Sequence, residues 1–451
     1  MTGVFNLLGD CVLSRPVSQL AGRDPAIAGV LELLARADVN CGNLETVIFD
    51  RRDFGGHPYP WDGDWTLAAE PAVAADLAAM NIRLVSRANN HALDWGPEGM
   101  RITSGLLDAA GVVHAGAGTS EPAARAACYL ETPGGRVALV SFATTFRPFS
   151  DALAARGEAP GRPGVSAVAL TRTAVVTDGV FDALAAAAAQ LGMPSGSDSC
   201  QFFGQTVRRA GCGQAGDGRA GADQARPPGE YRYQACPEHL AEVRRAIRLG
   251  RQHSDYLIAT LHSHEAVSEA EPTRPAHIVG DLGRLAIDAG ADAVVTTGIH
   301  CLGPVEIYRG RPIFHGLGNF FWSDIQQPLP HELYRVHRDL VAGSFEVPAE
   351  VTDADLSQVL NAASFDHSWV FESVVAQCRY DEGGLAELLL YPVELGRGRP
   401  LTTSGIPRMA GPGQAREIIE RLAVCSAPLG TRIQWTGTAG QVDLRHARRA
   451  A

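Results

Sequence analysis

Short apolar runs that end in polar or glycine-containing turns alternate with stretches of helical periodicity along much of the chain. The apolar runs predict strands at 4–8, 39–41, 83–86, 137–142, 256–261, 293–296 and 313–315. Helical periodicity, in places with an N-terminal proline, predicts helices at 27–36, 71–80, 97–110, 237–252 and 278–289. This alternation is typical of a layered α/β fold, so residues 1–145 and 255–325 are expected to form two blocks of one sandwich.

Two regions do not follow this alternation of predicted strands and helices. In the segment 191–228, Gly, Ser, Gln and Arg dominate and the periodicity disappears, which indicates a disordered insertion or a mobile cover over a site. Beyond residue 325, a strand-like run at 388–393 and a helix-like run at 414–424 predict a tail folded against the core. We therefore expect a catalytic domain over 1–325, including the Gly-rich insertion at about 191–228, and a C-terminal extension over 326–451.

Composition excludes several classes of function. The 451 residues carry a formal net charge of -11, from 39 basic against 50 acidic residues, which argues against a nucleic-acid partner. Every basic residue is Arg, because the sequence contains no Lys. A pyridoxal-phosphate enzyme needs a Schiff-base Lys and a P-loop site needs a phosphate-binding Lys, so neither pyridoxal phosphate nor a nucleotide is expected as cofactor.

Cysteine usage and the N-terminus bear on location. The 9 Cys are scattered, odd in number and without a C-x-x-C pair, as expected for reduced thiols in the cytosol. The first ten residues lack the basic region of a secretory signal. No apolar stretch reaches the roughly 18 to 20 residues that cross a bilayer. The sequence thus predicts a cytoplasmic protein without a membrane partner.

Polar side chains that can bind metals follow five of the predicted strands. Carboxyl ends of strands in layered α/β folds gather ligands at one edge, so these residues are expected to converge. Carboxylate, carboxamide and imidazole groups suit Mn, Zn, Fe, Mg or Ca, and the lack of Cys among them disfavours a structural zinc. A catalytic site for one or two divalent ions is predicted, with Glu45 able to bridge two. The residues are Asp10, Asn43, Glu45, Asn90, His91, His262, His264 and His300.

The motifs around these residues resemble one known family. They are Gly9-Asp10, Gly42-Asn43-Leu44-Glu45-Thr46, Ala88-Asn89-Asn90-His91-Ala92-Leu93-Asp94, Leu261-His262, Ile299-His300 with Pro304-Val305-Glu306, and Gly316-Leu317-Gly318-Asn319-Phe320. In this order, over roughly 4–325, they are similar to the CapA-type branch of the metallophosphatase superfamily, named for poly-gamma-glutamate capsule synthesis. The resemblance implies a four-layer αββα metallophosphatase-like sandwich with a metal centre between its two sheets.

The resemblance also implies roles for individual residues. His91 matches the superfamily histidine that is not a ligand but moves a proton, and Asp94 matches the group that orients it. Asn43 and Asn319 match residues that support the ligands or shape turns. Asp10 or His300 would act with His91 as the second catalytic group. The implied metal ligands are Asp10, Glu45, Asn90, His262 and His300.

Two departures from the family pattern matter. Relatives often carry a His-x-His pair at the last motif, whereas this chain has Gly298 at the first position. Relatives usually carry Gly two residues after the histidine of the fourth motif, whereas this chain has His264. His264 therefore either supplies the lost imidazole or acts as a base beside the metal. A weakened second metal position would put ordinary phosphoester hydrolysis in doubt.

Three functions fit these parts. The first is a metal-dependent epimerase that inverts a Cα centre of a peptide by acid/base chemistry without an organic cofactor, as in a lasso-peptide epimerase of the same superfamily. The segment 191–228 and the tail containing Trp369 could then shape a peptide groove. The second is metal-dependent hydrolysis of a phosphoester, amide or gamma-glutamyl bond. The third is a non-catalytic peptide or glycan binder.

Overall fold

The computed structural model describes residues 2–59, 65–211, 228–323 and 329–444. Its larger sheet has the strand order β23 (Ile433–Trp435), β24 (Gly440–Val442), β21 (Gly384–Glu394), β20 (Glu372–Asp381), β1 (Gly3–Leu13), β2 (Val39–Leu44), β5 (Ile82–Ser86) and β6 (Val113–Ala115). Two further strands pair outside this path, β19 (Asn319–Ser323) with β1 and β22 (Arg408–Met409) with β21.

The second sheet has six strands and packs face to face on the first. Its order is β17 (Val305–Tyr308), β18 (Arg311–Phe314), β16 (Ala293–Thr297), β15 (Tyr256–His262), β9 (Gly135–Ala143) and β8 (Cys128–Thr132). One buried apolar cluster joins the inner faces, in which Phe5 and Leu7 of β1 meet Tyr256 and Ile258 of β15. The rings of Phe5 and Tyr256 lie 4.9 Å apart, edge to face. Residues 1–145 and 255–325 thus both contribute to one sandwich, but they are not its two separate blocks, because β8 and β9 belong to the smaller sheet and β19 belongs to the larger one.

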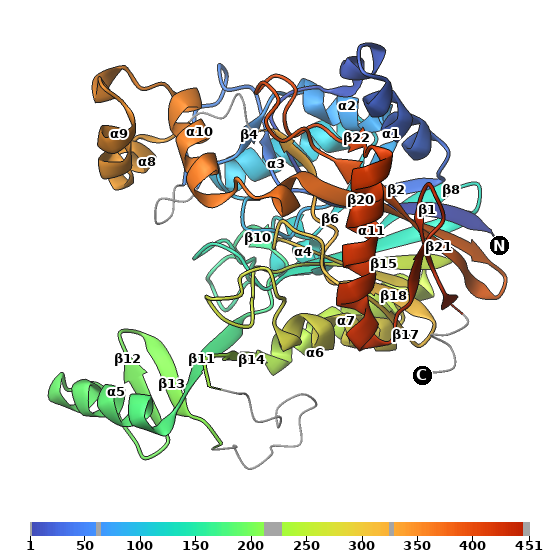
Figure 1. Ribbon diagram of the computed structural model, residues 1–451. Helices are drawn as coiled ribbons and strands as arrows, with labels where there is room; N and C mark the ends of the chain where they lie inside the picture. Colours follow the sequence, from blue (N-terminus) through green and yellow to red (C-terminus); the bar gives the residue numbers. More distant parts are fainter. Residues whose placement is uncertain (1, 60–64, 212–227, 324–328, 445–451) are drawn as a thin grey trace.

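Helices cover both outer faces (Figure 1). Helices α1 (Pro25–Ala35), α2 (Ala72–Ala79) and α3 (Gly96–Ala109) lie on the larger sheet, and α6 (Pro237–Gln252) and α7 (His277–Ala289) lie on the smaller one. Helix α1 shows why, since Ile27, Val30 and Leu34 recur at helical spacing on its buried face. The predicted mixed α/β architecture, a metallophosphatase-like sandwich, is confirmed.

The prediction that the first strand covers 4–8 and that Asp10 follows its end is wrong. Strand β1 continues to Leu13, because Cys11, Val12 and Leu13 are apolar and buried. Asp10 lies where β1 changes its neighbour, from β20 up to Leu7 to β19 from Asp10 onward, and the register shifts there. The strand keeps its core contacts on both sides of this irregularity, and Asp10 reaches the site from within the strand.

Gly9 allows the close approach of β1 and the turn before β19. The backbone N–H of Asp10 donates to Gly318 O at 3.0 Å, and a Cβ at position 9 would lie 1.8 Å from the same oxygen. Gly9→Ala is expected to lower the free energy of unfolding by about 3 kcal/mol or more, since overpacking against backbone cannot be relieved by a rotamer change.

Urea denaturation measures this effect. Gly22→Ala is the matched control, because a Cβ at position 22 meets no atom within 4 Å, and it should stay within about 1 kcal/mol of the parent. Equal stability of the Gly9→Ala and parent proteins would contradict the packing argument.

The Gly-rich segment expected at about 191–228 has regular structure in its described part. Strands β12 (Ser199–Phe202) and β13 (Gln205–Arg209) form a hairpin that joins β11 (Leu170–Val176) and β14 (Tyr231–Ala235) in a four-stranded sheet, with α5 (Asp178–Gln190) packed on it. The expectation of a segment without periodic structure is corrected there, because strands of only 4 and 5 residues leave little periodicity in the sequence. Residues 212–227 lie outside the described residues. The described part projects away from the sandwich (Figure 1).

The C-terminal extension adds strands to the larger sheet. Strand β20 pairs with β1, so the larger sheet contains strands from both sides of residue 325. The predicted strand at 388–393 lies within β21, and the predicted helix at 414–424 lies within α11 (Pro412–Ser426). A small helical cluster consists of α8 (His331–Val336), α9 (Arg338–Ser344) and α10 (Asp353–Ser364).

The remaining short elements of the chain are η1 (Ser18–Gly22), β3 (Val47–Ile48), β4 (Ala68–Ala69), β7 (Ala117–Gly118), α4 (Glu121–Arg125), β10 (Gly164–Val165), η2 (Pro348–Glu350), η3 (Ser368–Phe371) and η4 (Ala427–Leu429).

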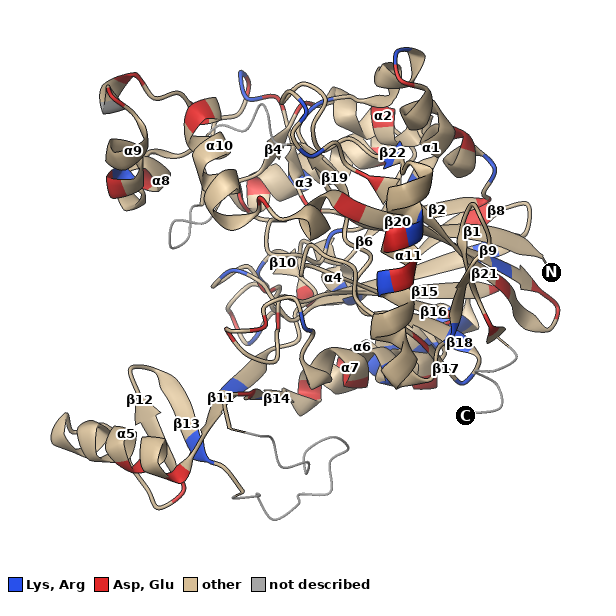
Figure 2. Cartoon of the chain, viewed as in Figure 1, with Lys and Arg blue, Asp and Glu red and all other residues tan. Residues whose placement is uncertain are grey.

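Acidic and basic residues are interleaved along the elements rather than segregated by sign (Figure 2). On α11, for example, Arg416 pairs with Glu420 at 2.7 Å. Within the described ranges, every helix is too short or too polar to cross a membrane.

Candidate metal centre

Residues from both sheets meet in two overlapping groups of potential ligands. Asp10, Glu45 and His262 form one group, and Glu45, His264 and His300 form the other. Within each group, one ligand atom from every residue lies within 4.8 Å of the others. Glu45 belongs to both groups, so the arrangement can hold one ion or two ions that share a carboxylate.

The first group is fully buried and centred on His262. The Nε2 atom of His262 lies 3.4 Å from Glu45 Oε1 and 2.9 Å from Asn90 Oδ1. Its Nδ1 atom lies 3.9 Å from Asp10 Oδ1, and Asn43 Nδ2 donates to that oxygen at 2.8 Å. The structure thus brings together Asp10, Glu45, Asn90 and His262, which the sequence analysis selected, and Asn43 contacts Asp10.

The second group is partly open. His264 Nε2 lies 3.0 Å from His262 Nε2. His300 Nδ1 lies 2.9 Å from Asn319 Oδ1 and 3.4 Å from Asp10 Oδ2. Asn319 Nδ2 in turn donates to Val370 O at 3.0 Å, so Asn319 fixes the ring of His300 to the C-terminal extension.

Protonation states in the site suit a divalent cation. Burial lowers the pKa of His262 to about 3 and holds the pKa of His264 well below its usual range. Burial opposes ionisation of Asp10, yet the hydrogen bond and charge of His300, with His262 and Asn43, keep its pKa well below the usual value. Neutral imidazole and ionised carboxylate are the forms that coordinate metal, so the donor set fits one or two divalent ions.

Gly298 and His264 occupy complementary space. A Cβ at position 298 would lie 2.7 Å from His264 Cδ2 and 2.8 Å from Ser263 O, at a φ of +109°. The backbone N–H of Gly298 donates to Asp10 Oδ2 at 3.0 Å. The imidazole of His264 thus stands against the position from which relatives supply a histidine. This placement favours His264 as a replacement ligand over the alternative of a separate base.

His264→Ala is expected to remove one of the two candidate metal positions. The variant keeps Asp10, Glu45 and His262, so metal should remain at the buried position while the metal-to-protein ratio at saturation falls. Elemental analysis of dialysed protein measures the ratio, with exposed His253→Ala as the matched control. An unchanged ratio would assign His264 to the role of a base.

A separate buried triad lies beside the metal groups. His91 Nδ1 lies 2.7 Å from Asp94 Oδ2, and Arg147 Nη2 pairs with Asp94 Oδ1 at 3.1 Å. The N–H of Leu67 also donates to Asp94 Oδ2 at 2.6 Å. Since Nδ1–H of His91 faces the carboxylate, Nε2 is the atom available for proton transfer. His91 belongs to neither ligand group, and its role in proton transfer stays a prediction.

Sequence reasoning missed several supporting residues. Arg147 lies between Phe146 and Pro148 beyond β9, and no local pattern connects it with Asp94. Asn89 donates from Nδ2 to Asn43 Oδ1 at 3.1 Å and accepts from the N–H of His91, and its place in the asparagine pair of the third motif could have indicated a role. Thr297 Oγ1 lies 3.0 Å from His262 Nδ1.

Comparisons with known proteins agree with the motifs. Residues 4–323 match the family described as "Bacterial capsule synthesis protein PGA_cap". Two proteins of Sinorhizobium fredii, "Uncharacterized protein y4sH" and "Uncharacterized protein y4uA", are each 41% identical over 447 residues, covering 97% of this chain and 92% of theirs. "PGA biosynthesis protein CapA" of Bacillus subtilis is 22% identical over 321 residues, covering 70% of this chain and 63% of that protein. The resemblance to the CapA type is confirmed, and the chain belongs to the bacterial capsule synthesis protein (PGA_cap) family.

Proposed function

We propose that the protein is a metal-dependent epimerase that inverts one Cα centre of a peptide, such as the precursor of a lasso peptide. The family and the two ligand groups support a metallophosphatase-like enzyme that uses divalent cations. The observation that carries the finer proposal is the triad of His91, Asp94 and Arg147, which lies beside the ligands without belonging to them.

The placement of proton carriers suits inversion. Epimerisation needs one group to take a proton from Cα and another to return a proton to the opposite face. His91 comes from the loop after β5 of the larger sheet, and His300 comes from the loop after β16 of the smaller sheet. A substrate held between them meets an imidazole from each sheet, with Asp10 as the alternative to His300.

Each part of the chain has a task in this scheme. A divalent ion bound by Asp10, Glu45 and His262 would draw electron density from a substrate carbonyl and acidify the adjacent Cα–H. His91 Nε2 exchanges one proton with the substrate, while Asp94 and Arg147 hold the ring and its tautomer. Asn319 holds the ring of His300. The proton removed passes to one side chain and the proton added comes from the other, so the peptide keeps its composition.

Hydrolysis is the second candidate, and one observation favours it. Glu45 belongs to both ligand groups, as a carboxylate shared by two ions does in two-metal hydrolytic sites. A site filled at both positions would engage His300 as a ligand and leave His91 as the proton donor to a leaving group.

Solvent deuterium separates these reactions. The protein, a divalent metal and a set of linear peptides that vary the C-terminal residue are incubated in deuterium oxide. Epimerisation predicts one deuterium at a single Cα, an intact backbone and a D-residue on chiral analysis. Unlabelled cleavage products would instead support hydrolysis, and peptides that are bound but unchanged would contradict both in favour of a binder.

A further inference from the structure

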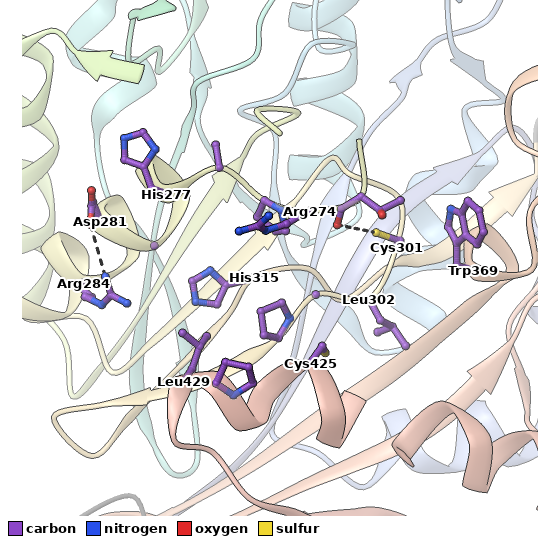
Figure 3. A pocket seen from close by; sticks show the side chains of 17 residues that line it. Arg274, His277, Asp281, Arg284, Cys301, Leu302, His315, Trp369, Cys425 and Leu429 are labelled. Atoms are coloured by element: carbon purple, nitrogen blue, oxygen red, sulfur yellow. Dashed lines mark hydrogen bonds and ion pairs between the residues drawn. The ribbon is translucent and has the colours of Figure 1, made fainter. Parts of the chain in front are cut away.

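A pocket of about 1070 Å³ lies between the smaller sheet and the C-terminal extension (Figure 3). Its lining comes from the loop before α7, the first two turns of α7, the loop after β16, His315 after β18, Trp369 of η3, and the end of α11 with η4. None of the metal-ligand candidates lines it. The pocket is therefore a separate feature that the proposed chemistry does not use.

The pocket adjoins the metal centre along two paths. Cys301 and Leu302, which line it, directly follow His300 in the chain. Trp369 directly precedes Val370, whose carbonyl oxygen accepts from Asn319. Asn319 also contacts His300, so a ligand in the pocket lies close to the residues that position this histidine.

The charges of the pocket are already paired. Arg284 contacts Glu306 at 2.8 Å and Asp281 at 3.5 Å, and the Arg284–Asp281 pair lies at the end of the pocket opposite Trp369 in Figure 3. Arg274 lies 3.4 Å from Glu271 and 3.7 Å from Glu230. Each guanidinium thus faces two carboxylates, and the whole chain carries a net charge of -11. A polyanionic ligand would find little positive potential here.

Apolar groups dominate the other end. Trp369 is 42% exposed although it is a large hydrophobic side chain, and Leu302 lies next to it in Figure 3. Leu429, 37% exposed, adds an apolar side chain on the side of Arg284 and His315. Trp369 is therefore a surface residue of the pocket and not part of the core. Ligand pockets typically measure about 300–1,000 Å³, so this pocket has room for several residues of a peptide rather than one side chain.

We propose that this pocket binds an uncharged, apolar segment of the peptide substrate and leaves the reacting residue at His300. The inference rests on the proposed function, because it names the part of the substrate that the same site recognises away from the reacting centre. Binding energy gained in the pocket would hold the reacting residue in place.

Protection of Cys425 from alkylation tests the inference without turnover. Cys425 is exposed and lines the pocket, so iodoacetamide should label it at a rate that mass spectrometry can follow. The probe is the heptapeptide acetyl-Gly-Leu-Gly-Phe-Gly-Leu-Gly amide. At about ten times its dissociation constant it should leave about one tenth of the pockets free and slow labelling about tenfold. A heptamer of gamma-linked glutamate is the charged comparison and should give no protection.

Two variants test whether the heptapeptide that protects Cys425 binds at Trp369. Trp369→Ala should weaken the apparent affinity of the heptapeptide about tenfold or more, as expected for an aromatic anchor. Phe203→Ala is the matched control, since Phe203 is an exposed aromatic residue outside the pocket, and should leave the affinity unchanged. Thermal unfolding of both variants is measured alongside, because Trp369 is only 42% exposed whereas Phe203 is 70% exposed, and affinities are compared at a temperature at which both variants are folded.

The possible outcomes distinguish failure of the pocket assignment from failure of the epimerase proposal. Equal protection by both heptamers, or no protection by the apolar one, would overturn the pocket assignment even if the protein epimerises peptides. Protection that depends on Trp369, in a protein that cleaves peptides and incorporates no deuterium, would retain the pocket and reject the epimerase.

Discussion

Glu45→Gln protein is expected to lose metal from both candidate positions. Glu45 is completely buried and is the residue common to both ligand groups. Glutamine keeps the shape and one acceptor oxygen but lacks the negative charge that offsets the charge of a divalent cation. Even residues that only support ligands change metal affinity by about 10- to 100-fold, so the loss of a shared ligand should exceed about 100-fold.

Elemental analysis after dialysis against a buffered metal concentration measures this loss. Unfolding of the metal-free proteins provides a second readout, and Glu45→Gln should be at least as stable as the parent because a buried charge has been removed. Glu372→Gln is the matched control, since Glu372 is also buried but pairs with Arg421 away from the ligands. Full metal content in Glu45→Gln would refute the shared-carboxylate arrangement.

His91→Ala protein is expected to keep its metal and lose turnover. His91 is absent from both ligand groups, whereas its ring is held by Asp94 at 2.7 Å beside them. Removal of a positioned proton carrier typically costs about 10²- to 10⁴-fold in rate. The rate of deuterium incorporation into the substrate peptide measures the effect, and metal analysis of the same sample shows whether the site is intact.

Asp94→Asn refines the same experiment. The carboxamide removes the charge that holds the Nδ1–H tautomer of His91, so the rate should fall with the metal content retained. His331→Ala, an exposed histidine on α8, is the control and should behave as the parent. Normal turnover of His91→Ala would remove the triad from the mechanism and with it the observation on which the epimerase proposal depends.

Local periodicity was sufficient to predict half of the strands of the sandwich and the helices on its outer faces. The predicted run at 256–261 is β15, and the predicted helix at 237–252 coincides with α6, because a buried strand and an amphipathic helix each leave a local pattern. Strand β20 was not predicted from the sequence, although it pairs directly with β1. The hairpin of β12 and β13 was likewise missed. Strand β20 pairs with β1 and β13 pairs with β11, both far away in the chain, and a local pattern contains little information about such pairing.

The candidate site likewise contains residues that the sequence indicated and contacts that it did not. Asp10, Glu45, His262 and His300 could be selected from the sequence because each follows or lies within an apolar strand in a recognisable motif. The strand containing Asp10 did not end where expected, since the apolar residues after it continue into the core. The contact of Arg147 with Asp94 had no local signal, because the two residues meet only when β9 and the loop after β5 are brought together.

The sequence by itself determined the family, the α/β class and the types of ligand offered at the strand ends, since motifs and periodicity are properties of short segments. Only the tertiary structure decided that Glu45 is common to two ligand groups, that His264 fills the space beside Gly298, and that Trp369 faces a pocket. These facts depend on distances between residues that the order and packing of two sheets bring together, and no local pattern encodes such distances.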